Sequence, residues 1–409
     1  MLLIPSESYR APDFMAAAAN LGIEVVVGSD QASPLEHLSE GRHAAFAFGD
    51  PETGAGQVET FADQFPLDRI MAVDDAGARL AAHAARRLEI PHNPVSAVEA
   101  TRNKAMLRER LARSGVPSPP WLVAPMDADP PTIARTVQFP VVLKPLSLSA
   151  SRGVIRANTP GEFVDAFDRI RRILGEPDAR EECGDLSDRI LIEGYVPGIE
   201  VSLEGLLSEG KLHVLALFDK PDPLEGPFFE ETIYVTPSRL PPDQQQEIVG
   251  TTERALAAIG LRDGPVHAEL RLNDDGVYPI DIAARSIGGL CSRTLTFGTG
   301  MSLEELLLRH ATGMDIPTLE REQQASGVMM LPIPGSGTLE SVHGIGHAEA
   351  VDGIQSVTLT IPIGKHVTAL PEGNEYLGFM FARGDTPEAV ERALREAHDR
   401  LRFDIHADE

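Results

Sequence analysis

Lys144 lies at a position in the sequence where a phosphate group could be bound. Lys144 ends the apolar run 141–143 and is followed by Pro145 and by the small, Ser-rich stretch 147–153. A lysine at the end of a buried strand can reach a phosphate as a point charge. The backbone N–H groups of a loop of small residues can also approach phosphate oxygens closely. We therefore expect a phosphate site here, the alternative being a surface lysine whose stem lies along the strand.

Two carboxylates farther along the chain are candidates for binding a divalent metal. Alternation along 266–272 puts Glu269 on the polar face of one predicted strand, and Asp281 faces away from its apolar neighbours in 277–284. A loop of odd length, counted as the five residues 273–277, places the two carboxylates opposite each other on one face, whereas an even loop separates them. Mg²⁺ prefers such hard oxygen ligands, with waters and substrate phosphates as the remainder. The pair predicts a Mg²⁺ site that could also take Mn²⁺, the alternative being a hairpin with solvated charges.

The elements that must position these groups alternate between strand and helix in the first hundred residues, which predicts a small parallel sheet. A Gly-rich loop is expected at 49–57 and a proline-rich connector at 117–131, and Thr101 is a candidate N-cap for a helix that ends at Arg113. Strands are expected at 2–4, 23–27, 44–48, 141–143, 190–192, 201–207, 266–272 and 277–284, and helices at 12–21, 76–88, 163–173 and 244–259. Beyond Gly313 short strands are expected, and Thr386 and Pro387 begin a final amphipathic helix.

Five patches stand in an order that resembles the ATP-grasp superfamily, and within it the carboxylate–amine ligases that include bacterial L-amino acid ligases and carnosine synthase. They lie at 101–104, 139–153, 191–200, 267–269 and 279–289. The resemblance covers nearly the whole chain and is densest from about 101 to 310. It implies an α/β (α+β) ATP-grasp fold with an N-terminal βαβ domain and a C-terminal β-rich domain. The boundaries expected are 1–100 for the N-terminal domain, 101–190 for the small lobe, 191–313 for the large lobe with the metal site, and 314–409 for the C-terminal domain.

The same resemblance implies a role for each candidate site residue. The nucleotide phosphates are expected at Lys104, Lys144, Ser149, Ser151 and Gly153. Glu193 is expected to take the adenine amino group, backbone groups of Tyr195 and Val196 to hydrogen-bond the base, and Glu200 to hold the ribose hydroxyls. Arg285, together with Lys144, is the catalytic candidate, because a guanidinium suits the charge that develops on a γ-phosphate. The alternatives without a role in binding are that Lys104 is solvated, that Glu193 and Glu200 are ordinary polar residues at strand ends, and that Arg285 forms a surface ion pair.

Three features depart from the family pattern. Asp281 stands where a Glu is common, Ala283 where an Asn is common, and the phosphate loop is Ser-rich and contains Arg152. The implied reaction uses ATP and Mg²⁺ to join a small carboxylate to a small amine through an acyl phosphate. Other ATP-grasp chemistry, of the biotin carboxylase or purine-synthesis kind, stays open, as does an ATP-binding protein with weak catalysis. Lys220, Arg293 and Cys291 have no settled role.

Composition sets the remaining limits. The 409 residues carry a formal net charge of −26, which argues against nucleic acid and anionic membranes as partners because both need basic patches. The two cysteines form no CxxC pair, so neither a zinc site nor a disulfide framework is indicated. The first residues lack a basic region followed by a long apolar run, which favours the cytoplasm. A homodimer is expected only from the family resemblance.

Overall fold

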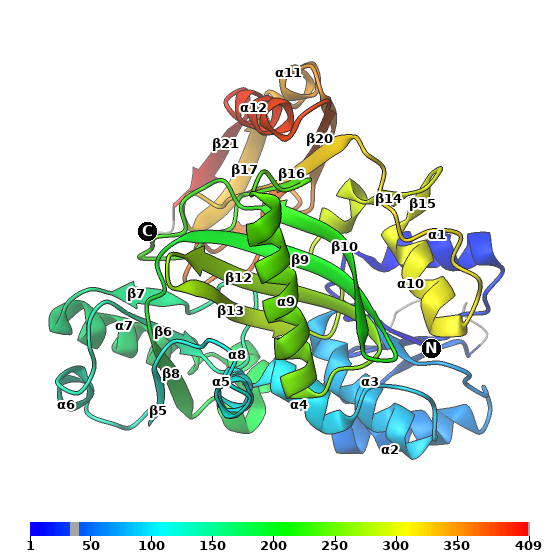
Figure 1. The fold of residues 1–409 in the computed structure, drawn as a ribbon, viewed down its shortest axis with the longest axis horizontal. Coiled ribbons are helices and arrows are strands. Elements are labelled where there is room, and N and C mark those ends of the chain that lie inside the picture. Colours follow the sequence, from blue (N-terminus) through cyan, green and yellow to red (C-terminus); the bar gives the residue numbers. More distant parts are fainter. Residues whose placement is uncertain (33–40, 408–409) are drawn as a thin grey trace.

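The computed structural model describes residues 1–32 and 41–407, and its first unit is a parallel sheet with the order β3-β2-β1-β4 (Figure 1). The strands and helices of this unit are β1 (Leu2–Leu3), α1 (Ala11–Leu21), β2 (Val27–Ser29), β3 (His43–Ala45), α2 (Pro51–Ala62), β4 (Met71–Ala72) and α3 (Asp75–Arg87). The expected parallel sheet is confirmed, although the strand predicted at 23–27 begins only at Val27.

The Gly-rich loop predicted at 49–57 is wrong, because this segment forms the helix α2. Asp50 caps the helix by accepting the N–H of Thr53, and Pro51 occupies the first turn. Gly54 is needed for packing rather than for a turn, since a Cβ at this position would lie 2.6 Å from the carbonyl oxygen of Ala47.

The second unit, here called the small lobe, is an antiparallel sheet with the order β5-β8-β6-β7 and its own buried core. Its elements are β5 (Trp121–Pro125), α6 (Pro130–Ala134), β6 (Val141–Pro145), β7 (Ile155–Ala157), α7 (Pro160–Ile173), α8 (Pro177–Cys183) and β8 (Arg189–Gly194). The expected connector at 117–131 is therefore wrong in part, because pairing of Trp121 with Glu193 draws this segment into the sheet.

Two helices lead into the small lobe. They are α4 (Val95–Arg102) and α5 (Lys104–Arg113). The predicted cap Thr101 lies inside α4 and its hydroxyl donates to the carbonyl oxygen of Val98. Asn103 is the actual cap, since its side chain accepts the N–H groups of Ala105 and Met106. The predicted single helix is thus two helices with a break at Asn103.

The largest sheet has eight strands in the order β13-β12-β9-β10-β11-β16-β20-β18. Its strands are β9 (Ile199–Ser208), β10 (Lys211–Asp219), β11 (Ile233–Thr236), β12 (Gly264–Asn273), β13 (Gly276–Ala283), β16 (Ala325–Leu331), β18 (Ile354–Leu359) and β20 (Gly378–Gly384). Helix α9 (Pro242–Ile259) packs with α5 on one apolar face of β9, β12 and β13. Strands β16, β18 and β20 follow residue 313 in the chain but belong to the same sheet as strands that precede it. The boundary expected at residue 313 therefore lies within one continuous sheet, and the domain boundaries stay predictions.

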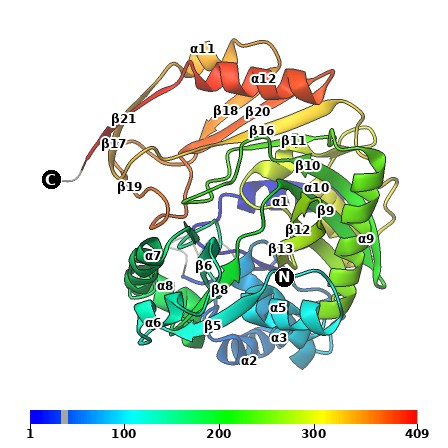
Figure 2. The same ribbon diagram turned by 60° about the vertical axis from the view of Figure 1, so that its left-hand side comes forward.

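The remaining elements surround the far end of that sheet. They are β14 (Thr296–Phe297), β15 (Met301–Ser302), α10 (Leu303–Thr312), β17 (Gly337–His343), α11 (Ile345–Glu349), β19 (His366–Val367), α12 (Pro387–His398) and β21 (Arg402–His406). The predicted start of α12 is confirmed, because the Thr386 side chain accepts the N–H of Ala389. Figure 2 shows the chain beside β19 descending toward α7 of the small lobe.

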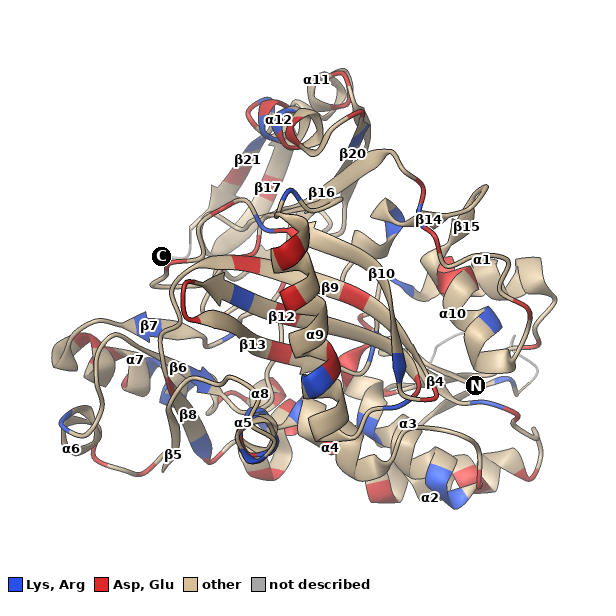
Figure 3. Ribbon diagram, viewed as in Figure 1, with Lys and Arg blue, Asp and Glu red and all other residues tan. Residues whose placement is uncertain are grey.

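Charged residues of both signs are interspersed over most elements rather than gathered on one of them (Figure 3). Within the described residues no helix combines the length and the apolar character needed to cross a bilayer.

Candidate active site

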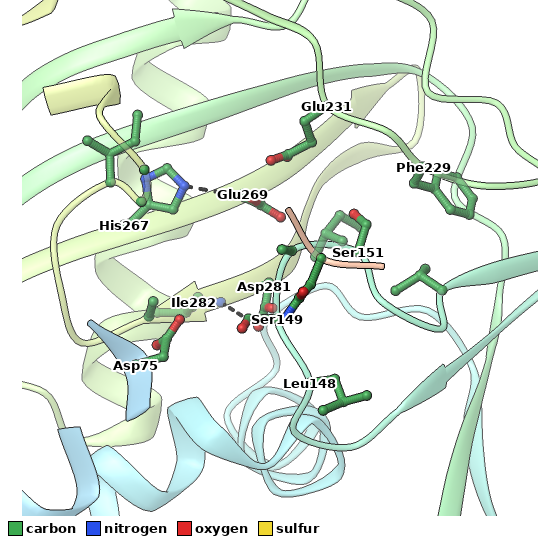
Figure 4. A pocket seen from close by; sticks show the side chains of 18 of the residues that line it. Asp75, Leu148, Ser149, Ser151, Phe229, Glu231, His267, Glu269, Asp281 and Ile282 are labelled. Atoms are coloured by element: carbon green, nitrogen blue, oxygen red, sulfur yellow. Dashed lines mark hydrogen bonds and ion pairs between the residues drawn. The ribbon is translucent and has the colours of Figure 1, made fainter. Parts of the chain in front are cut away.

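A cavity of about 580 Å³ lies where the N-terminal unit, the small lobe, the large sheet and the segment 374–379 meet (Figure 4). Its size is typical of a small-molecule site. The predicted site residues that line it are Lys104, Lys144, Ser149, Ser151, Glu193, Tyr195, Val196, Glu200, Glu269, Asp281 and Arg285.

Gly153 is the predicted site residue that does not line this cavity. Its N–H donates to the carbonyl oxygen of Pro371, 2.8 Å away. Its φ of +73° and the 2.8 Å that would separate a Cβ from Pro145 Cγ explain why a glycine stands here. Its N–H is therefore engaged by the C-terminal part of the chain, and a phosphate contact from it is not supported. Earlier in the same loop, Ala150 and Ser151 hold positive φ without being glycines, a strained conformation typical of binding loops.

Lys144 lies at the end of β6 and is buried beside Glu193, with 2.7 Å between its ammonium nitrogen and a carboxylate oxygen. Burial lowers the pKa of Lys144, and Glu193 opposes that effect. Lys104 is also buried: its ammonium group donates to the carbonyl oxygen of Leu148 at 3.0 Å and lies 3.3 Å from Asp281. The solvated alternative is thus wrong for both lysines, and both ammonium groups face the cavity.

Arg108 lies behind the cavity wall, where it holds the lining residue Glu193, and sequence reasoning missed it. It is fully buried on α5, where its Nε donates to one oxygen of Glu193 at 2.5 Å and its Nη2 to the other at 3.4 Å. Burial would raise the pKa of Glu193, but Arg108 and Lys144 outweigh it and hold this pKa at about 2. A signal existed in the sequence: Lys104 and Arg108 are one helical turn apart and share a face with the apolar Leu111.

Segment 194–198, here called the hinge, connects β8 of the small lobe to β9 of the large sheet and contains the backbone groups from which contacts to a base are expected. Tyr195 N–H donates to Pro140 O, and Val196 O accepts from Arg271. The carbonyl of Tyr195 and the N–H of Val196 have no partner among the residues that the structure describes. Gly198 makes the turn into β9 with φ +117°, and a Cβ there would lie 2.1 Å from a carbonyl oxygen of β12. One acceptor and one donor therefore remain available at the cavity wall.

Glu269 and Asp281 are direct cross-strand partners, as predicted, but the turn between their strands differs from the prediction. Asn273 pairs with Gly276, so the connection is an even two-residue turn, 274–275. The register then shifts at a β-bulge in which Ile280 is the extra residue, and this shift brings the two carboxylates opposite each other. Both face the cavity (Figure 4). Their hard oxygen atoms fit Mg²⁺.

Lys220, whose role the sequence left open, is buried among three carboxylates. Its ammonium group lies 2.9 Å from Glu200 and 3.4 Å from Glu269, and it also contacts Glu231. Burial would raise the pKa of Glu269, but Lys220 holds it well below the ordinary value, so this candidate metal ligand is ionised. Burial and the charge of Glu269 raise the pKa of Glu231 to about 7. The three carboxylates lie close enough together to share a cation, and the single positive charge of Lys220 offsets part of their negative charge.

Arg285 is half-buried against the N-terminal unit. Its Nε and Nη2 donate to one oxygen of Asp75 at 3.0 and 2.7 Å. Burial works against ionisation of Asp75, but Arg285 and Arg102 keep its pKa well below the usual range. Asp75 was not predicted as a partner, because it lies 210 residues from Arg285 in the chain. Arg285 lines the cavity, and its pairing with Asp75 holds its charge in place there.

The two other residues without a settled role lie at the margin of the site. Arg293 pairs with Asp13 on the surface at 2.8 Å and is not a lining residue, so a substrate contact is not supported. Cys291 is buried and lines the cavity. Burial raises the pKa of its thiol, which favours a structural role over a nucleophilic one.

Three family models match the chain. An ATP-grasp N-terminal domain matches residues 15–92, an ATP-grasp domain matches residues 137–294, and an L-amino acid ligase C-terminal domain 2 matches residues 329–406. Each of the three matched ranges contributes residues that line the cavity, among them Asp75, Lys144 and Tyr376.

Individual relatives point in the same direction. The crystal structure of an L-amino acid ligase from Bacillus licheniformis superposes with a TM-score of 0.83 at 26% identity, covering 99% of this chain and 98% of that one. Alanine–anticapsin ligase of Bacillus subtilis (strain 168) is 28% identical over 268 residues, which are 62% of this chain and 55% of that protein. Carnosine synthase 1 of Gallus gallus is 29% identical over 267 residues, 62% of this chain and 28% of that protein. The chain spans about half the length of the alanine–anticapsin ligase and a smaller part of carnosine synthase 1. It belongs to the ATP-grasp superfamily, in its carboxylate–amine ligase branch.

Proposed function

We propose that this protein is an ATP-dependent ligase that joins the carboxylate of one amino acid to an amine, forming an amide or peptide bond through an acyl phosphate. The observation that carries the proposal is one continuous cavity that brings together two buried lysines, a hinge with a free donor and acceptor, and a pair of carboxylates. The relatives named above, an L-amino acid ligase and an alanine–anticapsin ligase, support the same reaction class.

The nucleotide is proposed to lie along the hinge, with its base against the carbonyl of Tyr195 and the N–H of Val196. Its ribose would meet Glu200, and its phosphates would lie against Lys104, Lys144 and the serines of the 147–153 loop. Arg156 supports this placement, because its guanidinium stacks 4.0 Å from the centre of the Tyr195 ring and fixes one wall. Glu193 would reach the adenine amino group with lone pairs not used by Arg108 and Lys144.

Mg²⁺ would be held by Glu269 and Asp281, where it neutralises charge on the phosphates. The chain's own residues do the rest of the first step, in which a carboxylate oxygen attacks the γ-phosphorus and ADP leaves. Lys144 and Arg285 stabilise the charge on the transferring phosphoryl group. An amine then displaces phosphate from the acyl phosphate, and closure of the small lobe over the cavity would keep water away from that intermediate.

The amino acid substrates would occupy the end of the cavity formed by Tyr9, Asp75, Tyr376 and Phe379. Family resemblance also leads us to propose a cytoplasmic enzyme that forms a homodimer.

Pairs of amino acids with ATP and Mg²⁺ test the proposal, with ADP, AMP, phosphate and the organic product all measured. We expect ADP, phosphate and an amide in equal amounts. AMP with pyrophosphate would contradict the acyl-phosphate route. ATP binding without turnover for any pair would favour the weakly catalytic binding protein, for which Ala283, with no oxygen ligand to offer, is the specific reason. Turnover that requires bicarbonate would favour carboxylation chemistry.

A further inference from the structure

The segment 371–376 of the C-terminal part holds the phosphate loop of the small lobe. Pro371 O accepts the N–H of Gly153 at 2.8 Å, and Glu372 O accepts from Arg152 Nε at 2.8 Å. The Glu372 carboxylate also binds Arg169 on α7 with both oxygens, at 2.6 and 2.8 Å. Paired N–H···O bonds of this kind fix orientation as well as distance. These contacts fasten both the phosphate loop and helix α7 of the small lobe to the C-terminal part of the chain.

The other end of the same segment forms part of the cavity wall. Asn374, Glu375 and Tyr376 line the cavity, and the Tyr376 ring packs on Phe379 at 6.1 Å. Gly373 lies between the two ends in a tight turn, where a Cβ would meet the carbonyl oxygen of Thr368 at 1.8 Å. A short and closely packed stretch thus joins the phosphate loop to the part of the cavity that faces the N-terminal unit.

The small lobe is also anchored to segment 225–228, because Arg156 N–H donates to Pro227 O and Arg156 Nη1 donates to Glu225 O. It is joined to the large sheet by the hinge 194–198, and lobes connected in this way close over a ligand by rotation at a few residues. A reaction through an acyl phosphate needs the closed form, because water admitted to the cavity would hydrolyse the intermediate. A contact that favours the closed position of the phosphate loop would therefore favour product over hydrolysis.

We propose that Glu372 is a positioning residue that holds the phosphate loop closed through Arg169 and Arg152, and that segment 371–376 couples this closure to occupancy of the amino acid end of the cavity. Glu372 itself touches neither the nucleotide nor the substrates in this arrangement. Its effect passes through the loop that it holds.

The first test needs no turnover and uses the full chain. Glu372→Gln keeps the shape of the side chain but removes its charge, and so weakens the two hydrogen bonds to Arg169. We expect faster hydrogen exchange in the peptide that contains Gly153, and an affinity for a non-hydrolysable ATP analogue that is lower by about fivefold, the size expected for a partly exposed ion pair. Asp168→Asn is the matched control, because Asp168 pairs with Arg171 inside α7 and does not cross to the C-terminal part.

The second test rests on the proposed function and measures ADP released per amide formed. Opening of the loop should raise this ratio above one in Glu372→Gln and in Arg169→Gln. The double variant should give a ratio no higher than that of either single variant, because both substitutions remove the same contact. Arg169→Lys retains the charge and should recover part of the coupling. Addition of the amino acid should slow exchange at Gly153 in the parent protein and do so less in Glu372→Gln.

The outcomes separate the two proposals. No ADP from any amino acid pair would contradict the ligase function while the exchange experiment still decides the role of Glu372. Exchange at Gly153 and analogue affinity unchanged in Glu372→Gln, or changed equally in Asp168→Asn, would overturn the positioning role. Additive effects of Glu372→Gln and Arg169→Gln would overturn it as well.

Discussion

Arg108 binds the carboxylate of Glu193 with the Nε–Nη2 side of its guanidinium, while its terminal nitrogens also donate to two carbonyl oxygens of β13. Those bonds reach Pro279 O at 2.9 Å and Ile280 O at 2.7 Å. Glu193 belongs to the hinge strand, and Ile280 is the bulged residue beside Asp281. One buried side chain of α5 thus fixes the hinge of the nucleotide site relative to the candidate metal ligand.

Replacing Arg108 by Met should destabilise the protein by about 4 kcal/mol, because loss of one partner leaves a buried carboxylate with a single counter-ion and two carbonyl groups unpaired. Denaturant unfolding checks this value. Arg113→Met, at an exposed ion pair on the same helix, should change the free energy of unfolding by less than about 1 kcal/mol. If Arg108→Met also lowered the free energy of unfolding by less than about 1 kcal/mol, the contacts of Arg108 with Glu193 and β13 would not be coupled as described.

The stability of the protein should rise with pH in the window set by Glu193. Its pKa is about 2 in the folded chain and 4.5 without the fold, so the unfolded chain binds the extra proton between these values. The stabilisation is complete above pH 4.5 and is lost as pH falls toward 2, with a size of about 3 kcal/mol. The pH dependence of unfolding should therefore be shallower in Glu193→Gln than in the parent protein below pH 4.5. Glu109→Gln, at an exposed position, should keep the parent slope.

Lys144→Ala should weaken ATP binding by about tenfold or more, since a charge-assisted bond to a phosphate is lost. Protection of the protein by ATP against heat or protease measures this loss. Lys211→Ala, at an exposed position on β10, should keep full protection. Equal protection of both variants would show that the phosphates do not lie at Lys144.

How far the sequence predicts this site depends on whether a signal is local. Lys144, with its apolar strand and small-residue loop, is visible in a window of about ten residues, and the cap of α12 is equally local. The pairing of Glu269 with Asp281 was predicted, but from an odd loop that does not exist. The bulge that creates the register is held by Arg108, a residue about 170 positions away.

The partners that sequence reasoning missed share that property. Asp75 meets Arg285 across 210 residues, and Glu372 meets Arg169 across 203. No spacing rule in one chain links such positions, because only packing of separate units brings them together. The helix at α2 was missed for a different reason: three glycines outweighed the local Asp50–Pro51 start signal, although Gly54 is there for close packing.

The last prediction concerns the metal. Glu269 and Asp281 lie on one face of adjacent strands, and Ala283, opposite His267 in the same ladder, supplies no oxygen ligand. Mg²⁺ dehydrates reluctantly and relies on a small number of charged protein ligands, so each carboxylate should matter more here than in a site with a third one. Asp281→Asn should raise the Mg²⁺ concentration for half-maximal activity by about tenfold, as for loss of roughly 1.4 kcal/mol of metal binding.

Two companion variants sharpen that experiment. Ala283→Asn adds an oxygen ligand on the same face and should lower the Mg²⁺ requirement, while Asp281→Glu should be tolerated because it keeps the charge. Asp275→Asn, on the exposed turn of the same hairpin, is the matched control for loss of one negative charge. A Mg²⁺ titration that moves equally in Asp275→Asn and Asp281→Asn would reflect the net charge of the protein and not coordination. An unchanged titration in Asp281→Asn would remove this residue from the metal site and leave Glu269 to act with Glu200 or Glu231, whose oxygen atoms lie within 4.8 Å of its own.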